Sequence, residues 1–146
     1  MNTTLLITLG LLLVAVIAGA TYKFFHGRGH KVVGNECVDL TKLRADKNGD
    51  PVLEFGSKAT LLMFSTKYCG QCPGVRRALA KLEHRHGTLL FIEADITDRL
   101  DLAAHFNITQ TPTVFVLDPQ GKIRYRLGGT PKPGVIETEL TKLGVK

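Results

Sequence analysis

The sequence predicts an α/β domain, with a mixed central sheet flanked by helices, preceded by one N-terminal transmembrane helix. No charged side chain occurs in the first 22 residues. From residue 36 onward, short continuous apolar runs alternate with amphipathic stretches, which is typical of buried strands joined by helices. The length of 146 residues corresponds to about one domain of ordinary size.

The composition excludes several classes of protein. Hydrophobic residues make up 44% and charged residues 22% of the chain, as in ordinary globular proteins, which excludes collagen-like and wholly disordered chains. Three cysteines are too few for a small secreted protein stapled by disulfides. After residue 33, sixteen basic side chains face thirteen acidic ones. This bias is mild and predicts no nucleic-acid partner.

The N-terminal apolar segment is expected to be a membrane anchor over residues 1–22. Its core, residues 4–20, contains only apolar or small residues, and a helix of about 20 residues spans a hydrocarbon core of about 30 Å. The alternative is a cleaved signal peptide, because Ala18-Gly19-Ala20 has the form of a cleavage site. The lack of Lys or Arg before the run and the length of the run favour the uncleaved anchor.

The charges beside the apolar segment predict its orientation. Lys23, Arg28 and Lys31 follow the segment, whereas only the α-amino group precedes it. The positive-inside rule therefore places the C-terminal domain in the cytoplasm. We interpret residues 23–35 as a basic juxtamembrane linker and residues 36–146 as the folded domain. The membrane is thus one expected partner, through the N-terminal helix.

The apolar pattern predicts the elements of the domain in order. A short edge strand over residues 37–43 and a loop-rich segment over 44–56 come first. Strands are expected at 59–64, 89–94, 113–117 and 122–127, the last two joined by a turn at 118–121. Helices are expected at 69–86, at 98–106 with Thr97 as N-cap, and from Thr130 and Pro131 onward.

The chemistry of the chain is expected at Cys69-Gly70-Gln71-Cys72, between a predicted strand and a predicted helix. Free N–H groups and the positive end of the helix dipole stabilise a thiolate there, so the pKa of Cys69 should fall below about 8.5. A spacer of two residues brings Cys72 within disulfide distance. Cys69 would attack a substrate disulfide, and Cys72 would resolve the mixed disulfide.

Metal binding by the same cysteines is the competing interpretation. A structural zinc site needs four N or S ligands, often as two separated pairs. The sequence has one pair, and the remaining candidates are scattered, namely Cys37, His84, His86 and His105. We therefore expect no metal.

Three motifs resemble the thioredoxin family over roughly residues 36–145. They are the strand and helix around the dithiol, Thr111-Pro112-Thr113 before a strand, and Gly128 after a hairpin. The resemblance implies a thioredoxin fold and a cis peptide bond before Pro112, beside the dithiol. In such a site the backbone of Thr111 could pair with an extended substrate. The expected substrate-binding residues are Thr111 and Pro112 together with three residues next to the cysteines, Tyr68, Gly70 and Gln71.

The sequence departs from the family pattern near the dithiol. Tyr68 replaces the usual Trp and Gln71 the usual Pro, while Met63 stands where the family has a buried Asp that assists proton transfer. Glu93 could substitute for that Asp if it points at Cys72. Pro73 removes one N–H from the first turn of the helix.

Other polar and thiol groups have ordinary interpretations. Cys37 is expected to be a small buried residue, with a regulatory partnership with Cys69 as the alternative. Arg76 and Arg77 are expected to be solvated.

The anchor, the linker and this domain together resemble membrane-tethered thioredoxin-like proteins of bacteria. The implied function is a thiol–disulfide oxidoreductase of the plasma membrane that reduces or exchanges disulfides in protein partners. It would need no bound cofactor and would draw electrons from an upstream thiol reductase. The alternative is a redox-inactive thioredoxin-like module that binds a membrane partner.

Overall fold

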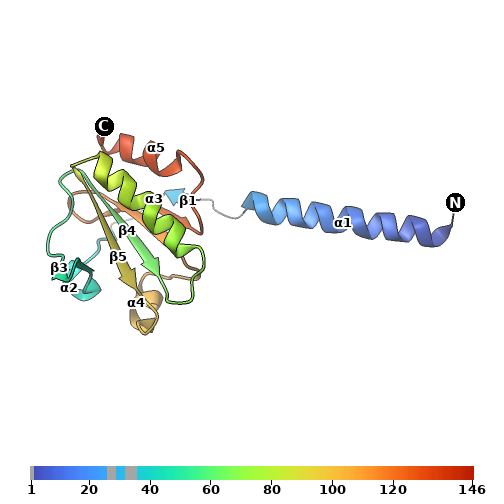
Figure 1. Cartoon of the computed structure of the whole chain (residues 1–146), viewed down its shortest axis with the longest axis horizontal. Helices are drawn as coiled ribbons and strands as arrows, with labels where there is room; N and C mark the ends of the chain where they lie inside the picture. The colour runs from blue at the N-terminus through green and yellow to red at the C-terminus, as the bar shows by residue number, and fades with distance from the viewer. Residues whose placement is uncertain (1, 26–28, 32–35) are drawn as a thin grey trace.

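A computed structural model describes residues 2–25, 29–31 and 36–146. Helix α1 (Thr3–Phe25) extends away from the domain (Figure 1). Its large apolar side chains are exposed. It is long and apolar enough to cross a membrane. The helix continues past residue 22, so Lys23 belongs to its last turn.

A mixed sheet of five strands forms the centre of the domain, in the order β1-β7-β6-β4-β5. β4 and β5 are parallel, and every other neighbouring pair is antiparallel. The strands are β1 (Gly29–Lys31), β4 (Ala59–Ser65), β5 (Leu89–Asp95), β6 (Thr113–Leu117) and β7 (Ile123–Gly128). The mixed sheet and the four strands expected after residue 58 are confirmed, because long buried runs leave few alternatives.

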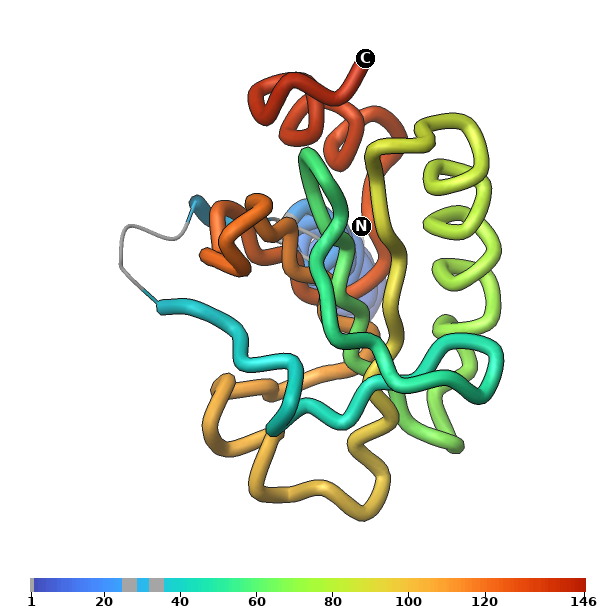
Figure 2. The backbone as a smooth tube through the Cα atoms, turned by 90° about the vertical axis from the view of Figure 1, so that its left-hand side faces the viewer, coloured from blue at the N-terminus to red at the C-terminus, as the bar shows by residue number. Residues whose placement is uncertain are grey.

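Helices cover both faces of this sheet. Successive side chains of a strand point to opposite faces, so each strand packs against helices on both sides. Leu61 and Met63 of β4 pack with α3 (Cys72–Arg85) and α5 (Val135–Lys142). Leu62 and Phe64 pack with the opposite helices, α2 (Leu40–Leu43) and α4 (Leu100–His105). Every residue of β4 is buried, so this strand forms the middle of the core (Figure 2).

The segment expected as an edge strand over residues 37–43 is mostly helical, so that prediction is wrong. Asp39 accepts a hydrogen bond from the backbone N–H of Thr41 and caps α2. Leu40 and Leu43, three positions apart, are both buried by the single turn. Only Cys37 forms an isolated bridge, with Lys122. The loop that follows contains a small hairpin of β2 (Asp46–Lys47) and β3 (Asp50–Pro51).

Three helices begin later than expected, and the first of them, α3, begins at Cys72 rather than at Cys69. The Thr97 side chain hydrogen-bonds Asp95 instead of capping a helix, and α4 begins at Leu100. α5 begins at Val135, after Gly134 in a left-handed conformation, rather than at Thr130. Two prolines precede this helix, Pro131 and Pro133, and proline disfavours the helical conformation of the residue before it.

The stretch that the sequence predicts as a juxtamembrane linker contains regular structure. Residues 23–25 continue α1, and residues 29–31 form β1, which pairs with β7 at the edge of the sheet. Residues 26–28 and 32–35 lie outside the described part of the chain.

Candidate active site

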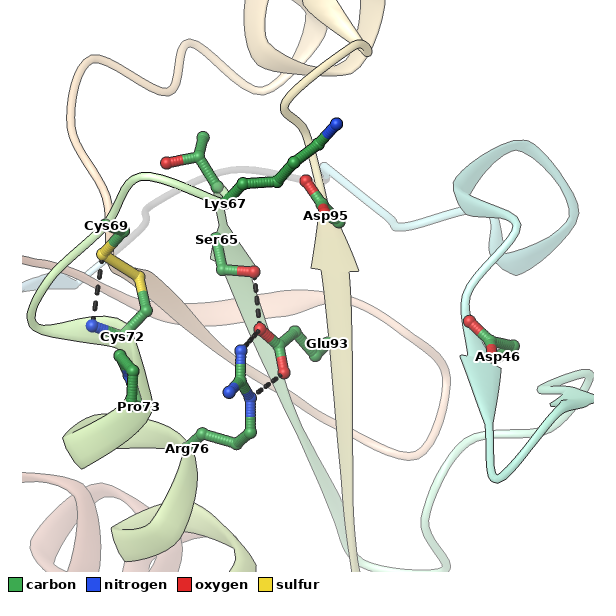
Figure 3. Close-up of a pocket in the computed structure, with 10 residues that line it drawn as sticks. Asp46, Ser65, Lys67, Cys69, Cys72, Pro73, Arg76, Glu93 and Asp95 are labelled. Atoms are coloured by element: carbon green, nitrogen blue, oxygen red, sulfur yellow. Dashed lines mark hydrogen bonds and ion pairs between the residues drawn. A yellow bond between two sulfur atoms is a disulfide. The ribbon is translucent and has the colours of Figure 1, made fainter.

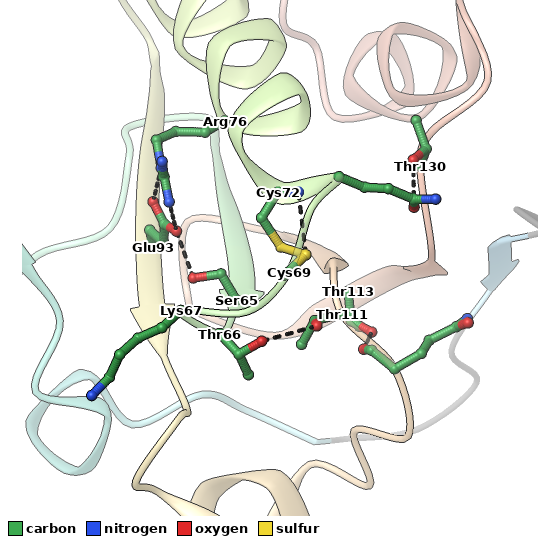
Figure 4. Close-up of a disulfide and its surroundings, with 12 residues drawn as sticks. Ser65, Thr66, Lys67, Cys69, Cys72, Arg76, Glu93, Thr111, Thr113 and Thr130 are labelled. Atoms are coloured by element: carbon green, nitrogen blue, oxygen red, sulfur yellow. Dashed lines mark hydrogen bonds and ion pairs between the residues drawn. A yellow bond between two sulfur atoms is a disulfide. The ribbon is translucent and has the colours of Figure 1, made fainter.

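The two cysteines of the predicted dithiol lie at the carboxyl end of β4, where α3 begins. They form a disulfide with a Cα–Cα distance of 5.5 Å (Figure 4). Cys69 is half-buried, whereas Cys72, the first residue of α3, is 1% exposed. Cys69 is therefore the sulfur that a partner protein reaches first.

The start of α3 directs a hydrogen-bond donor at Cys69. The backbone N–H of Cys72 donates to Cys69 Sγ over 3.2 Å. Gln71, the N-cap residue, makes no side-chain capping bond, and Pro73 has no N–H to offer. Among the described residues, the Cys72 N–H is thus the group of α3 that donates a hydrogen bond to Cys69 Sγ.

A second loop lies against the dithiol. The Thr111–Pro112 peptide bond is cis, as the resemblance implies. The loop is fixed by a bond from Gly129 N–H to the Pro112 carbonyl over 2.7 Å and by the Thr66 and Thr111 hydroxyls, 3.4 Å apart. The Thr111 backbone makes no hydrogen bond to another described residue, so it is available to an extended peptide.

The expected substrate-binding residues divide into two groups. Gly70, Gln71 and Thr111 line one open groove together with Cys69. The Gln71 side chain accepts a hydrogen bond from Thr130 at 2.9 Å, which holds the rim of the groove. Tyr68 is 88% exposed and Pro112 is buried, and neither lines this groove.

A polar pocket lies on the other side of the dithiol and includes Cys72 (Figure 3). In it, Arg76 of α3 binds both carboxylate oxygens of Glu93, at 2.5 and 2.7 Å. Ser65 donates to the same carboxylate at 2.5 Å. Burial raises the pKa of Glu93, but the hydrogen bonds from Arg76 and Ser65 and the charge of Arg76 outweigh burial and leave that pKa below its ordinary value.

This pocket bears on two expectations. Arg76 is 48% exposed, as expected of a solvated side chain, but it also forms an ion pair with Glu93 that the sequence did not predict. Sequence reasoning missed the pair because its members are 17 positions apart and meet only when α3 packs on β5. Met63 is fully buried, and its register partner on β5 is Glu93. The Glu93 carboxylate hydrogen-bonds Ser65 and Arg76, and no hydrogen bond joins it to Cys72 among the described residues.

The third cysteine lies apart from this site. Cys37 is exposed and free, so the prediction of a buried Cys37 is wrong. It lines a groove with residues of α2 and α4, a groove that does not include Cys69. Within the described ranges, no three His, Cys, Asp or Glu side chains gather as they would around a metal ion.

The arrangement can carry out thiol–disulfide exchange. Cys69 offers an accessible sulfur with a backbone donor, and Cys72 offers a buried second sulfur three residues later. The loop with the cis Thr111–Pro112 bond adds a backbone edge that makes no hydrogen bond to another described residue. Such a site can take an extended substrate that contains a disulfide. The fold and this dithiol define the molecule as a thiol–disulfide oxidoreductase.

Comparison with known proteins gives the same class. The family model described as Thioredoxin matches residues 40–142. The chain belongs to the thioredoxin family. Thioredoxin H9 of Arabidopsis thaliana is 29% identical over 111 residues, covering 76% of this chain and 73% of the relative. Thioredoxin of Ophiophagus hannah is 31% identical over 83 residues, covering 57% of this chain and 70% of the relative.

Solved structures share the fold. Thioredoxin f2 of Chlamydomonas reinhardtii superimposes with a TM-score of 0.54 at 18% identity, covering 62% of this chain and 84% of that one. Thioredoxin f of spinach chloroplast also gives 0.54, at 21% identity, covering 61% and 73% of the two chains. The family model begins at residue 40, so helix α1 lies outside the matched domain.

Proposed function

We propose that this chain is a membrane-tethered thiol–disulfide oxidoreductase that reduces or exchanges disulfides in protein partners through Cys69 and Cys72. The observation that carries the proposal is the dithiol at the start of α3 beside the cis Thr111–Pro112 bond. Helix α1 supports the tether, since it is apolar and exposed along its length.

Each site residue has a defined role in this proposal. The Cys69 thiolate attacks one sulfur of the substrate disulfide, and the other substrate sulfur leaves and takes a proton. Cys72 then loses its proton and attacks Cys69 Sγ, which releases the second substrate thiol. Two electrons pass to the substrate, and the protein is left with the disulfide seen in the structure. Thr111 holds the substrate backbone, and Gly70 and Gln71 form the rim.

The catalytic cycle needs an electron donor outside the chain. An upstream thiol reductase would return the Cys69–Cys72 disulfide to the dithiol by the reverse exchange, and the chain itself needs no bound cofactor. The charges that follow the apolar segment support a domain in the cytoplasm. The location in the plasma membrane of a bacterium rests on the resemblance to membrane-tethered thioredoxin-like proteins of bacteria.

Two serine variants of the full chain test this proposal. With a disulfide-containing protein as substrate and dithiothreitol as donor, Cys69→Ser should lose all catalysed reduction. Cys72→Ser, reduced beforehand and freed of dithiothreitol, should instead accumulate a covalent mixed disulfide through Cys69, because the resolving thiol is missing. Cys37→Ser is the matched control and should keep full activity, since Cys37 lies in a separate groove. Full activity in Cys69→Ser would show that Cys69 is not the nucleophile, and a parent chain no faster than dithiothreitol alone would leave a binding role in place of catalysis.

A further inference from the structure

The register of the edge strand places the end of the membrane anchor at the dithiol end of the sheet. β1 runs antiparallel to β7, and its first residue, Gly29, pairs with Leu127. The next residue of β7, Gly128, pairs with Thr113, which directly follows the Thr111–Pro112 bond. The start of β1 therefore lies at the same end of the sheet as the cis-proline loop, with β7 between β1 and β6.

The chain between anchor and sheet is short. Only residues 26–28 separate the last residue of α1, Phe25, from Gly29. Even fully extended at about 3.6 Å per residue, the four steps span at most about 14 Å. The seven residues of β4, at about 3.3 Å each, place the opposite end of the sheet roughly 20 Å farther away. Among the ends of the sheet, the dithiol end is the one held near the membrane surface.

Side chains of the two parts meet in this region. Tyr22 and Lys23 of α1 line the same groove as Cys69, Thr111 and Thr130. The Lys132 ammonium lies 5.9 Å from the centre of the Phe24 ring, within range of a cation–π contact. In Figure 1, α1 leaves the domain next to β1. The substrate groove is thus bordered by Tyr22 and Lys23, at the end of the anchor where the chain would leave the bilayer.

We propose that the groove faces the bilayer and that its substrate is a disulfide in another membrane protein, in the segment next to the membrane surface. This inference rests on the proposed function and names its substrate class. Enzyme and substrate held in one bilayer meet at a raised effective concentration, provided that the geometry lets them engage. A groove lined by Tyr22 and Lys23 at the end of the anchor meets that condition for a disulfide near the membrane surface and fails it for a distant one.

The test uses the full chain, reduced beforehand, in phospholipid vesicles with one of two membrane-spanning probe peptides. Each probe carries an intramolecular disulfide, either next to the bilayer or about 40 Å away on a helical spacer of about 27 residues. Trapping with a membrane-impermeant alkylating reagent and mass spectrometry give the rate for outward-facing molecules. We expect the near probe to react at least about tenfold faster, as for tethered partners with matched reach. Equal rates, or a faster distant probe, would overturn the inference.

Two insertions of the same eight Gly and Ser residues provide matched variants. Placed after residue 27, the insertion lengthens the path from α1 to β1, and the preference for the near probe should fall toward one. Placed after residue 33, it leaves that path unchanged because β1 remains paired with β7, and the preference should persist. If both insertions act alike, the strand does not set the position of the groove.

A small soluble disulfide separates the two proposals. All variants should reduce it at one rate, because it reaches the groove from water. If no variant reduces it, the proposed function fails. If all reduce it but the two probes react equally, only the membrane-facing inference fails.

Discussion

The backbone N–H of Cys72 donates to Cys69 Sγ at 3.2 Å, so a donor is already in place where the thiolate forms. Because this donor lies at the start of a 14-residue helix, the helix dipole acts in the same direction. Pro73 limits the effect, since it contributes no N–H to the first turn. The reactivity of Cys69 therefore depends on one backbone donor and the dipole, with no acidic residue in the first turn of α3 to oppose them.

We expect the thiolate of Cys69 to form with a pKa below the ordinary cysteine value of about 8.5. The measurement is the pH dependence of absorbance at 240 nm in reduced protein carrying Cys37→Ser and Cys72→Ser. The same protein in denaturant is the control and should titrate near 8.5, because the helix is lost. A folded-state midpoint at or above the denatured value would contradict the role given to the Cys72 N–H.

Glu93 gives a pH-dependent contribution to stability with a defined sign. Its pKa in the folded protein lies below that of an unfolded Glu, which is about 4.3. The contribution is therefore fully present above about pH 4.3 and is lost as the pH falls through the lower, folded-state pKa. Arg76 is 48% and Glu93 22% exposed, so solvent screening keeps the pair weak.

Glu93→Gln should lower the free energy of unfolding by about 0.5–1 kcal/mol at pH 7. The difference from the parent protein should shrink at a second, acidic pH below the folded-state pKa of Glu93, where the carboxylate is protonated in both the folded and the unfolded state. Denaturant titrations at the two pH values measure it. Glu54→Gln is the control, since Glu54 is exposed and ion-paired with no described residue. A difference that is the same at both pH values would show that the charge of Glu93 is not involved.

At the scale of elements, α3 is held by one apolar face and thereby fixes both cysteines. Val75, Leu79 and Leu82 are buried against the sheet, whereas Arg77 and Lys81 are exposed. Because Cys72 is the first residue of this helix, its position relative to Cys69 depends on how the helix packs. A loss of packing in the middle of α3 is felt at the dithiol through the helix as a whole.

Leu79→Ala should reduce the free energy of unfolding of the oxidised protein by about 2–5 kcal/mol, the range for buried leucines. Leu79 is 1% exposed, so the deleted atoms leave a cavity. Lys81→Ala, on the exposed face of the same helix, should change stability by less than about 0.5 kcal/mol. Denaturant unfolding followed by circular dichroism compares the two. Equal effects would mean that α3 is not held by this face.

The predictability of the elements follows their hydrophobic patterns. β4 and β6 are continuous apolar runs, and the spacing of Val75, Leu79 and Leu82 marks α3. β1 has no such signal: Gly29, His30 and Lys31 are polar or small, and they form a strand because β7 offers them a free edge. α2 is not predicted, because the spacing of apolar residues in a single turn of helix resembles that in a short strand.

The candidate site was predictable where its residues are neighbours in the chain and less so where folding brings them together. The dithiol and the Thr111–Pro112 pair carry short local motifs. The Arg76–Glu93 pair joins a helix to a strand, and no local pattern marks it. The meeting of Tyr22 and Lys23 with the groove of Cys69 depends on β1, which the sequence does not reveal.

At the scale of the whole molecule, the orientation of α1 determines the side of the membrane on which the domain and its substrates lie. The three cations that follow the apolar segment, Lys23, Arg28 and Lys31, predict that the domain lies in the cytoplasm. Cys37 provides a probe of this orientation because it is exposed and free, whereas the other two cysteines form a disulfide.

A membrane-impermeant maleimide should label Cys37 in permeabilised bacterial cells but not in intact spheroplasts. The reporter for the other side is Asn2→Cys in a Cys37→Ser background, which should be labelled in intact spheroplasts because it lies at the opposite end of α1. Labelling of Cys37 without permeabilisation would place the domain outside the cytoplasm.

The central claim is that Cys69 and Cys72 form a reversible two-electron couple. The most direct measurement is the reduction potential of the full chain carrying Cys37→Ser, equilibrated in defined thiol–disulfide buffers, trapped by alkylation and weighed by mass spectrometry. We predict complete interconversion of dithiol and disulfide, with a midpoint between about −270 and −120 mV, the range of proteins that exchange disulfides through such motifs. A dithiol or disulfide that does not interconvert across those buffers would contradict the account.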